Sequence, residues 1–391
     1  MLENALIRII EQLTKGDRLS DLEREWLVHD LQNTAYSLSR LDLKISDLEI
    51  RSKLSRLIDE RSLFLRLAYP EISQILIAHN IKLDPPSLIF PILWHYWLPL
   101  AQHLANQQSQ IGRTFIQGLM GGQGTGKTTL GIVLEILLRH LGKTFLSISL
   151  DDLYKTYSDR QKLRDRRPAF IWRGPPNTHD IDLGIEVLHK LRDRHPDHPQ
   201  PIAIPRFDKS LYNGAGDRIA PEISYGADIV LFEGWFVGMR PLPISAFRNF
   251  VPPILSESDR EFALECNANL YDYLPLWDYL DRLIVLKPED YQYSLQWRIE
   301  AEHKLIDSGK TGMGDAEITK FVEYFWKALH PELFMHQMVG QMISSRDRPL
   351  DRLLGEQIDQ QILGDLAYAD LVVEISRSHL PTRIQQKLLQ T

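Results

Sequence analysis

The sequence predicts an α/β fold in which helices flank a parallel β-sheet, preceded by an all-helical N-terminal region. Three observations lead to this prediction. Residues 121–128 match the phosphate-binding pattern GxxxxGK[ST], short apolar segments alternate with helical patterns from residue 113 onward, and the first 110 or so residues are poor in glycine and patterned as helices. Because strands that alternate with helices form parallel sheets covered by helices, we expect a nucleotide-binding domain over residues 111–391 and a helical region over 1–110.

The N-terminal region contains two capping-box patterns, one from Ser20 to Glu23 and one from Ser46 to Glu49. In this pattern a serine side chain and an acidic side chain three residues later each bond the other's backbone N–H group at a helix start. We therefore expect a helix to begin at each place. No motif assigns a role to residues 1–110, and their helices are a candidate surface for a protein partner.

The glycine-rich loop has the flanking structure that its motif requires. Residues 114–120 are short and apolar, which predicts a strand, and apolar residues recur at helical spacing over 130–139. Glycines let backbone N–H groups surround phosphate oxygens, and the following helix adds a favourable dipole. The sequence therefore predicts a P-loop NTPase fold that binds a nucleoside triphosphate. The residues expected to contact it are Gly121, Gly122, Gln123, Gly124, Thr125, Gly126, Lys127, Thr128 and Thr129.

Three side chains are expected to serve the phosphates and a metal ion. Lys127 would reach the β- and γ-phosphates, and the hydroxyl of Thr128 would bind Mg²⁺. A strand predicted at 227–232 is followed by Glu233, where P-loop enzymes carry a carboxylate for Mg²⁺ or its water. An exposed acid at a strand end is the weaker alternative for Glu233.

The other predicted elements follow the same alternation along the chain. Strands are expected at 143–150, 282–286 and 369–375, and helices at 183–194, 289–306 and 315–329. Ligands of such sheets bind at the carboxyl ends of the strands, so polar residues directly after a strand are candidates for the site.

Asp151 and Asp152 directly follow the strand predicted at 143–150. A carboxylate about 3 Å from an acceptor hydroxyl can orient it and take its proton, as phosphoryl transfer requires. Aspartate at a strand-to-helix turn is also a common helix cap, and capping suffices for one of the two residues.

Two polar segments could face a small anion. Residues 173–180 offer a cation and hydrogen-bonding groups, although taken alone they are better explained as a surface turn with a capping aspartate. Residues 205–218 read as a loop with two flexible glycines and three cationic side chains, and a solvated mixed-charge loop explains them equally well. The candidates for substrate contacts in the two segments are Arg173, His179, Asp180, Arg206, Lys209 and Arg218.

A weaker signal is Arg298 on the helix predicted at 289–306. Kinases close arginine-bearing lids over the phosphates, which excludes water and neutralises charge in the transition state. A solvated helix face explains the arginine equally well.

The composition excludes several classes of function. A net charge of −7 and a pI near 6.0 argue against a basic nucleic-acid-binding surface. The single cysteine, Cys266, excludes an intrachain disulfide and a multi-cysteine zinc site, so a reducing compartment such as the cytoplasm is expected. The most apolar stretch, 88–100, is short and broken by prolines, and the N-terminus lacks a secretory pattern, so no membrane association is expected.

In chain order the motifs resemble the plant-type D-glycerate 3-kinase family. The segments that carry the resemblance are GQGTGKTT, SLDDLY, RGPPNTHD, PRFDKS with the following GDR, and FEGWFVG, within roughly residues 113 to 375. Members of this family are P-loop kinases related in fold to uridine kinase, phosphoribulokinase and the bacterial pantothenate kinases. Leu153 stands where relatives commonly have phenylalanine, and Asn177 with the two prolines before it departs from the family pattern.

The resemblance implies that ATP and Mg²⁺ phosphorylate D-glycerate to 3-phosphoglycerate. It assigns Asp151 as the base, Lys127 and Arg298 to phosphate charge, and Thr128 and Glu233 to the metal. The substrate-side motifs contain Asp152, Tyr154, Arg173, His179, Asp180, Arg206, Lys209 and Arg218. Two alternatives remain open: a kinase for pantothenate, a nucleoside or a sugar phosphate, and a nucleotide-dependent binding protein with a degenerate kinase domain.

Overall fold

The computed structural model describes residues 2–33, 47–79, 81, 83, 85–194, 198–249, 251–307, 309, 312–339 and 368–386. The chain forms two compact units. The first consists of residues 1–113, 128–146 and 227–229, and the second of residues 114–127, 147–226 and 230–391.

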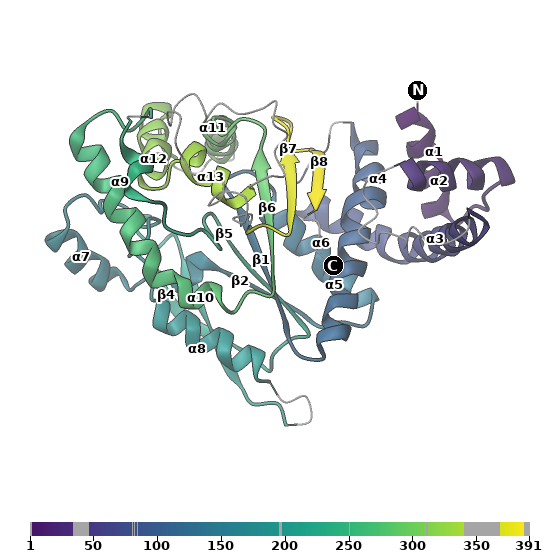
Figure 1. Cartoon of the computed structure of the whole chain (residues 1–391), viewed down its shortest axis with the longest axis horizontal. Helices are drawn as coiled ribbons and strands as arrows, with labels where there is room; N and C mark the ends of the chain where they lie inside the picture. Colours follow the sequence, from purple (N-terminus) through teal and green to yellow (C-terminus); the bar gives the residue numbers. More distant parts are fainter. Residues whose placement is uncertain are drawn as a thin grey trace. The chain divides into compact units, whose positions relative to one another are not determined.

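The first unit is built mainly of helices (Figure 1). They are α1 (Leu2–Lys15), α2 (Asp21–Asn33), α3 (Asp47–Ala78), α4 (Ile89–Ile92), a π-helix (Leu93–Trp97), α5 (Leu98–Ile111) and nearly all of α6 (Lys127–His140). The capping box predicted before α2 is confirmed, since Glu23 N–H donates to Ser20 Oγ (3.3 Å) and Ser20 N–H donates to Glu23 Oε2 (3.0 Å). The second predicted box involves Ser46, which lies outside the described residues.

Contacts from the end of α6 join it to the N-terminal helices. Arg139 forms an ion pair with Glu71 of α3. The ring of His140 lies edge-on to Phe64 with centroids 6.2 Å apart. Lys143 Nζ, just after α6, donates to Gln108 Oε1 of α5 at 2.7 Å. The helices that precede the P-loop in sequence therefore pack with the helix that follows it.

The central sheet has the strand order β2-β5-β1-β6-β7-β8. Its strands are β1 (Phe115–Gly121), β2 (Phe145–Ser149), β5 (Ile229–Gly234), β6 (Arg282–Pro288), β7 (Leu371–Ile375) and β8 (Pro381–Gln386). β1 pairs with β6 and β6 with β7 in parallel, as predicted, whereas β8 adds an antiparallel strand that the sequence analysis did not include. All seven residues of β1 are buried, which explains its unbroken apolar pattern.

The second unit also carries seven α-helices among the described residues (Figure 1), of which α12 packs against α9 and α11, and α10 against α8. They are α7 (Tyr157–Arg166), α8 (Ile181–Arg192), α9 (Glu257–Asn269), α10 (Leu274–Trp277), α11 (Tyr293–Asp307), α12 (Asp315–Ala328) and α13 (Pro331–Val339). The predicted helices at 183–194, 289–306 and 315–329 correspond to α8, α11 and α12.

Reading residues 205–218 as a loop is wrong at both ends of the segment, which belong to strands. β3 (Ile202–Asp208) and β4 (Asp217–Ser224) form an antiparallel hairpin in which Phe207 pairs with Arg218. Pro205 and the two glycines gave the segment the composition of a loop. The glycines lie in the turn between the strands, where Gly214 (φ +88°) and Gly216 (φ +69°) adopt left-handed backbone. Cross-strand pairing thus overrides the local signal.

The longest described helix, α3, has 32 residues but carries many charged side chains. Within the described part of the chain, no helix combines the length and apolar composition needed to cross a bilayer.

Candidate active site

The P-loop connects the end of β1 to the first residue of α6. Gly124 (φ +80°) and Gly126 (φ +90°) have left-handed backbone, which glycine adopts without a steric penalty. Lys127 Nζ donates to the carbonyls of Gly121 (2.7 Å) and Gly122 (3.1 Å), so the lysine side chain folds back over the loop. Thr128, the expected metal ligand, and Thr129 follow Lys127 directly in the first turn of α6.

Two aromatic residues from distant segments cover the tip of the loop. Trp297 of α11 packs so closely on Gly124 that a Cβ atom there would lie 2.7 Å from the tryptophan side chain. His379, in the turn between β7 and β8, stacks on Trp297 with centroids 4.6 Å apart, and its Nδ1 lies 2.8 Å from Gly124 O. The sequence analysis found neither residue, because each is ordinary within its own segment.

Asp151 lies in a short 3-10 helix (Leu150–Leu153) at the end of β2. Lys209, in the turn of the β3–β4 hairpin, places its Nζ 2.7 Å from Asp151 Oδ2. Burial favours the neutral carboxyl, but the Lys209 ammonium outweighs burial, with help from the Tyr154 hydroxyl, and the pKa of Asp151 falls below its ordinary value of 3.8. The residue expected to act as a base is therefore ionised at neutral pH.

Asp152 has a different environment from Asp151. Its Oδ2 accepts the Ser149 N–H (3.0 Å) in a capping box and pairs with Arg206 Nη1 at 3.0 Å. Burial raises the pKa of Asp152, against the pull of those partners. The structure thus separates two adjacent aspartates: one is a helix cap with an arginine partner, and the other faces Lys209.

Glu233 closes β5, with its Oε2 3.9 Å from Lys127 Nζ. Burial lowers the pKa of Lys127, and the negative charges of Glu233 and Asp151 oppose this shift. The phosphate-binding lysine and both carboxylates therefore lie within electrostatic range of one another. This brings together Lys127, Asp151 and Glu233, which the sequence analysis had placed at separate strand ends.

The donor set at Glu233 suits Mg²⁺ bound jointly with phosphate. Among the described residues, no group of three or more His, Cys, Asp or Glu side chains could hold a metal ion unaided. Mg²⁺ typically uses one or two carboxylates together with substrate phosphates, and a single carboxylate beside the P-loop lysine matches that requirement.

Comparisons with known proteins show to which family the chain is related. The chain is 30% identical over 311 residues to the chloroplastic D-glycerate 3-kinase of Arabidopsis thaliana, a match that covers 74% of this chain. It is 30% identical over 234 residues to the "uncharacterized kinase mug58" of Schizosaccharomyces pombe, and here the match covers 58% of this chain and 83% of the other. The chain belongs to the P-loop kinase family of the D-glycerate 3-kinases.

A solved structure supports the same relationship. D-glycerate 3-kinase from Cryptococcus neoformans superposes with a TM-score of 0.58 at 26% identity, covering 74% of this chain and 99% of that one. The match to the Arabidopsis protein spans 64% of that protein's length. No protein-family model matches the sequence.

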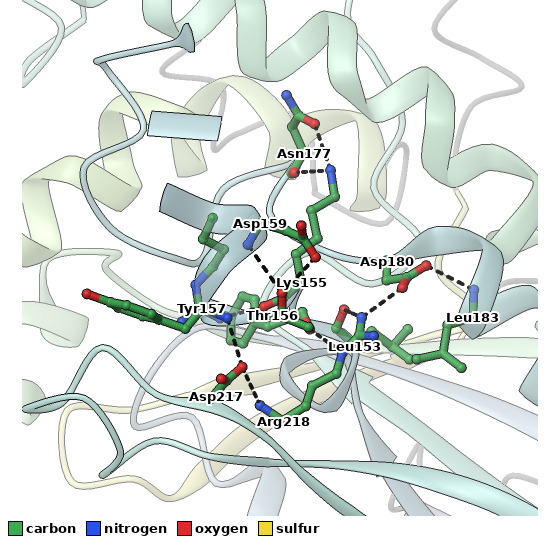
Figure 2. Close-up of polar contacts among 12 residues, drawn as sticks. Leu153, Lys155, Thr156, Tyr157, Asp159, Asn177, Asp180, Leu183, Asp217 and Arg218 are labelled. Carbon is green, nitrogen blue, oxygen red and sulfur yellow. Dashed lines mark hydrogen bonds and ion pairs between the residues drawn. The ribbon is translucent and has the colours of Figure 1, made fainter. Parts of the chain in front are cut away.

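The three arginines predicted to contact the substrate are bonded to neighbouring groups. Arg218 Nη2 forms an ion pair with Asp180 Oδ2 at 2.9 Å (Figure 2). The Nε group of Arg218 donates to Tyr154 O at 2.7 Å. Arg206 bridges Asp152 and Glu222. Arg173 Nη1 donates to Gly214 O at 2.6 Å and lies over the Tyr154 and Phe207 rings. These arginines hold the hairpin and the segment after β2 in place.

The segment from 153 to 159 is fixed from several sides (Figure 2). Lys155 Nζ donates to Asn177 O (2.8 Å), and Tyr157 N–H donates to Asp217 Oδ1 (2.8 Å). Asp180 also caps α8 by accepting the Leu183 N–H at 3.2 Å. Asn177 departs from the family pattern, and its φ of +86° is a left-handed conformation that asparagine tolerates better than most residues.

The side chain of Arg298 contacts residues of its own helix, α11, and of the neighbouring helix α12. Its Nη2 pairs with Glu302 Oε2 (2.8 Å), a side chain only 6% exposed, and its guanidinium lies over Phe321 of α12. No contact described in the structure brings Arg298 to the P-loop or to Asp151. Its neighbour Trp297 makes the contact with the loop instead.

Two further buried residues, Arg160 and Tyr273, hold these segments together, a role that the sequence did not predict for either. Arg160 donates to the carbonyls of Ala215 (2.7 Å) and Gly216, which secures the hairpin turn. Tyr273 Oη lies 2.7 Å from His179 Nδ1 although the two residues are far apart in the chain. A charged residue in a short helix and a tyrosine in an apolar segment give no local signal of these roles.

Proposed function

We propose that this protein is an ATP-dependent kinase that phosphorylates D-glycerate to 3-phosphoglycerate. The observation that carries the proposal is the ionised Asp151, held by Lys209 within electrostatic range of Lys127 and Glu233. A base, a phosphate-binding lysine and a candidate metal carboxylate in one place are the parts that phosphoryl transfer needs. The acceptor is taken from the family relationship to D-glycerate 3-kinases.

Each residue has a role that follows from its position. The P-loop N–H groups and Lys127 bind the phosphates of ATP, and Asp151 orients the acceptor hydroxyl and takes its proton. Thr128 and Glu233 are the residues that would hold Mg²⁺, whose charge offsets that of the phosphate oxygens when the ion is bound. Positioning and electrostatics account for most of the rate in such reactions.

The cations near Asp151 favour an anionic acceptor. Lys209 is 60% exposed and keeps N–H groups for a second partner, and Arg173 uses only one nitrogen in its bond to Gly214. A carboxylate adjacent to the reacting hydroxyl would find a cation within this group, as expected for a small hydroxy acid.

A panel of acceptors tests the proposal. ADP release from the full-length protein is measured with D-glycerate, L-glycerate, pantothenate, uridine and a sugar phosphate, and the product is identified by ³¹P NMR. We expect D-glycerate to give the highest kcat/KM and the phosphate to appear on the 3-hydroxyl. A preference for pantothenate, uridine or the sugar phosphate would refute the substrate assignment. ATP hydrolysis without any phosphorylated acceptor would instead favour a nucleotide-dependent binding protein.

A further inference from the structure

The turn between β7 and β8 carries a histidine in an unusual backbone conformation. His379 has a φ of +62°, a left-handed value that residues other than glycine adopt at a steric cost. The turn holds it there, because Ser376 N–H donates to Leu380 O at 2.9 Å and His379 N–H donates to Ser376 O at 3.0 Å. Strained backbone of this kind clusters at functional sites. From this position the side chain contacts two segments that are distant in sequence, α11 and the P-loop.

Trp297 of α11 supports the imidazole ring of His379 from one side. The two rings stack with centroids 4.6 Å apart and an interplanar angle of 29°. The indole Nε1–H donates to Arg377 O at 2.8 Å, which attaches the tryptophan to the same turn. Only 3% of Trp297 is exposed, so it offers a fixed surface, whereas His379 itself is exposed. The stacking therefore restricts the orientation of the imidazole.

A hydrogen bond joins His379 to the tip of the P-loop. Its Nδ1 lies 2.8 Å from Gly124 O. A carbonyl oxygen only accepts hydrogen bonds, so Nδ1 carries a hydrogen and donates it. The bond fixes the peptide between Gly124 and Thr125, because a planar trans peptide has its C=O and N–H groups on opposite sides. With the Gly124 carbonyl held toward the histidine, the Thr125 N–H points away from it and across the loop.

The Thr125 N–H points to the side of the loop on which the phosphate-binding lysine lies. The Thr125 nitrogen is 3.5 Å from Gly122 O, and Lys127 Nζ donates to the same oxygen at 3.1 Å. A distance of 3.5 Å is longer than the typical N–H···O value of about 2.9 Å, so a phosphate oxygen would be a stronger acceptor for this group. Two donors thus converge where the P-loop motif binds phosphates.

The glycine at 124 makes this orientation depend on the histidine. With a φ of +80° and no Cβ atom, Gly124 offers little resistance to rotation of the peptide that follows it. A larger residue would restrict that rotation, but its Cβ would lie 2.7 Å from Trp297. A rotated peptide would turn the Gly124 carbonyl toward the phosphates and repel them. The restriction therefore has to come from outside the loop, and the bond from His379 supplies it.

We propose that His379 is a positioning residue for ATP, whose Nδ1–H group holds the peptide between Gly124 and Thr125 in the orientation that presents the Thr125 N–H to the phosphates. The inference rests on the proposed ATP-dependent kinase function and adds to it a residue, far from the P-loop in sequence, that preorganises the loop. It predicts that His379 acts on the phosphates of the nucleotide, and neither on its base nor on the acceptor.

Two substitutions separate the donor from the backbone conformation. His379→Gly keeps the left-handed turn but removes the ring, whereas His379→Asn tolerates the same backbone and places an amide N–H near the position of Nδ1. In calorimetric titrations of the full-length protein with Mg²⁺, His379→Gly should raise Kd for ATP by about 3- to 10-fold, and His379→Asn should recover most of the loss. KM for the best acceptor of the panel should stay unchanged. Equal affinities for the wild-type and Gly proteins, or equal losses for Gly and Asn, would overturn the inference while the kinase function held.

Tripolyphosphate distinguishes positioning of the loop from contact with the base. It carries the phosphates of ATP without the base or the ribose, so in competition with ATP its Kd should rise in His379→Gly by the same factor as that of ATP. A loss for ATP alone would mean that the ring touches the base, and the inference would fail. His303→Asn is the control, because His303 is an exposed histidine of α11 that pairs with Asp315, and both affinities should stay unchanged.

The orientation of the peptide can be observed without any nucleotide. In the full-length protein labelled with ²H and ¹⁵N, the amide signal of Thr125 should move in His379→Gly and return toward its wild-type position in His379→Asn. The amide signal of Leu183 in α8 should stay in place in both variants. A Thr125 signal that is identical in the wild-type and Gly proteins would overturn the inference, whatever the protein phosphorylates.

Discussion

Lys209 Nζ lies 2.7 Å from Asp151 Oδ2, so the expected base and an expected substrate cation are bonded to each other. The two residues come from different parts of the second unit, the 3-10 helix after β2 and the hairpin turn. Burial alone would raise the pKa of Asp151, and this ion pair is the main interaction that lowers it instead. The chemistry of the base therefore depends on the hairpin.

Asp151→Asn should lower kcat by at least about 100-fold, because the amide cannot accept the hydroxyl proton. KM for ATP should change little, since the P-loop is intact. Steady-state kinetics with both substrates varied would measure the two effects. Asp152→Asn is the matched control: its side chain caps a helix and pairs with Arg206, so thermal stability should fall while turnover is largely retained. The reverse pattern would mean that Asp152 is the base.

Lys209→Met should move the acid limb of the kcat/KM profile to higher pH. In the wild-type protein the pKa of Asp151 is below its ordinary value of 3.8, so the ionised base is lost only as pH falls through that lowered pKa. Without the ammonium, burial raises the pKa, and activity should be lost at a higher pH. Profiles from pH 4 to 8 would reveal the shift. Lys162→Met, which removes an exposed ammonium paired with Asp159, should leave the profile unchanged.

Gly124→Ala should weaken ATP binding and destabilise the protein by more than about 1 kcal/mol. Its φ of +80° is strained for alanine, and the new Cβ would lie 2.7 Å from Trp297. Gly122→Ala is the control, because its Cβ would meet nothing within 4 Å. Calorimetric titration with ATP and thermal unfolding of both variants test this. Equal losses at Gly122 and Gly124 would show that Trp297 does not constrain the loop.

Arg298→Ala should destabilise the protein by about 1 to 3 kcal/mol, because Glu302 would remain buried without its partner. The double variant Arg298→Ala with Glu302→Gln should recover most of that stability, since the uncompensated charge is removed. Denaturant unfolding measures both. Turnover then separates structure from catalysis: kcat that stays low in the stable double variant supports a lid role for the arginine. Full recovery of kcat would limit Arg298 to holding α11.

Many of the candidate site residues could be predicted from the sequence because they lie at strand ends. The P-loop follows β1, Asp151 follows β2 and Glu233 lies near the end of β5, and the direction of parallel strands brings such positions to one edge of the sheet. The hairpin of β3 and β4 could not be predicted in this way. Each of its strands contains a proline and its turn contains two glycines, so only the pairing of the strands, such as Phe207 with Arg218, reveals the structure.

The sequence also left open whether each charged residue acts in the site, caps a helix or is solvated, and the contacts in the fold are needed to distinguish these. Locally, Asp151 and Asp152 are equivalent, and their partners Lys209 and Arg206 lie on the hairpin. Arg298 fits a lid arginine in sequence, yet its side chain forms an ion pair with Glu302 one helical turn away. A side chain's partners depend on which segments meet in space, and no pattern within one segment contains that information.

The sequence by itself determined the P-loop, the alternation of strands and helices around it and the family, because these depend on local spacing and on motifs within single segments. Tertiary structure alone decided that Asp151 pairs with Lys209 and Asp152 with Arg206, and how Trp297 and His379 cover Gly124. The physical reason is that ion pairs, pKa values and packing are set by groups a few ångströms away, which the chain supplies from distant residues.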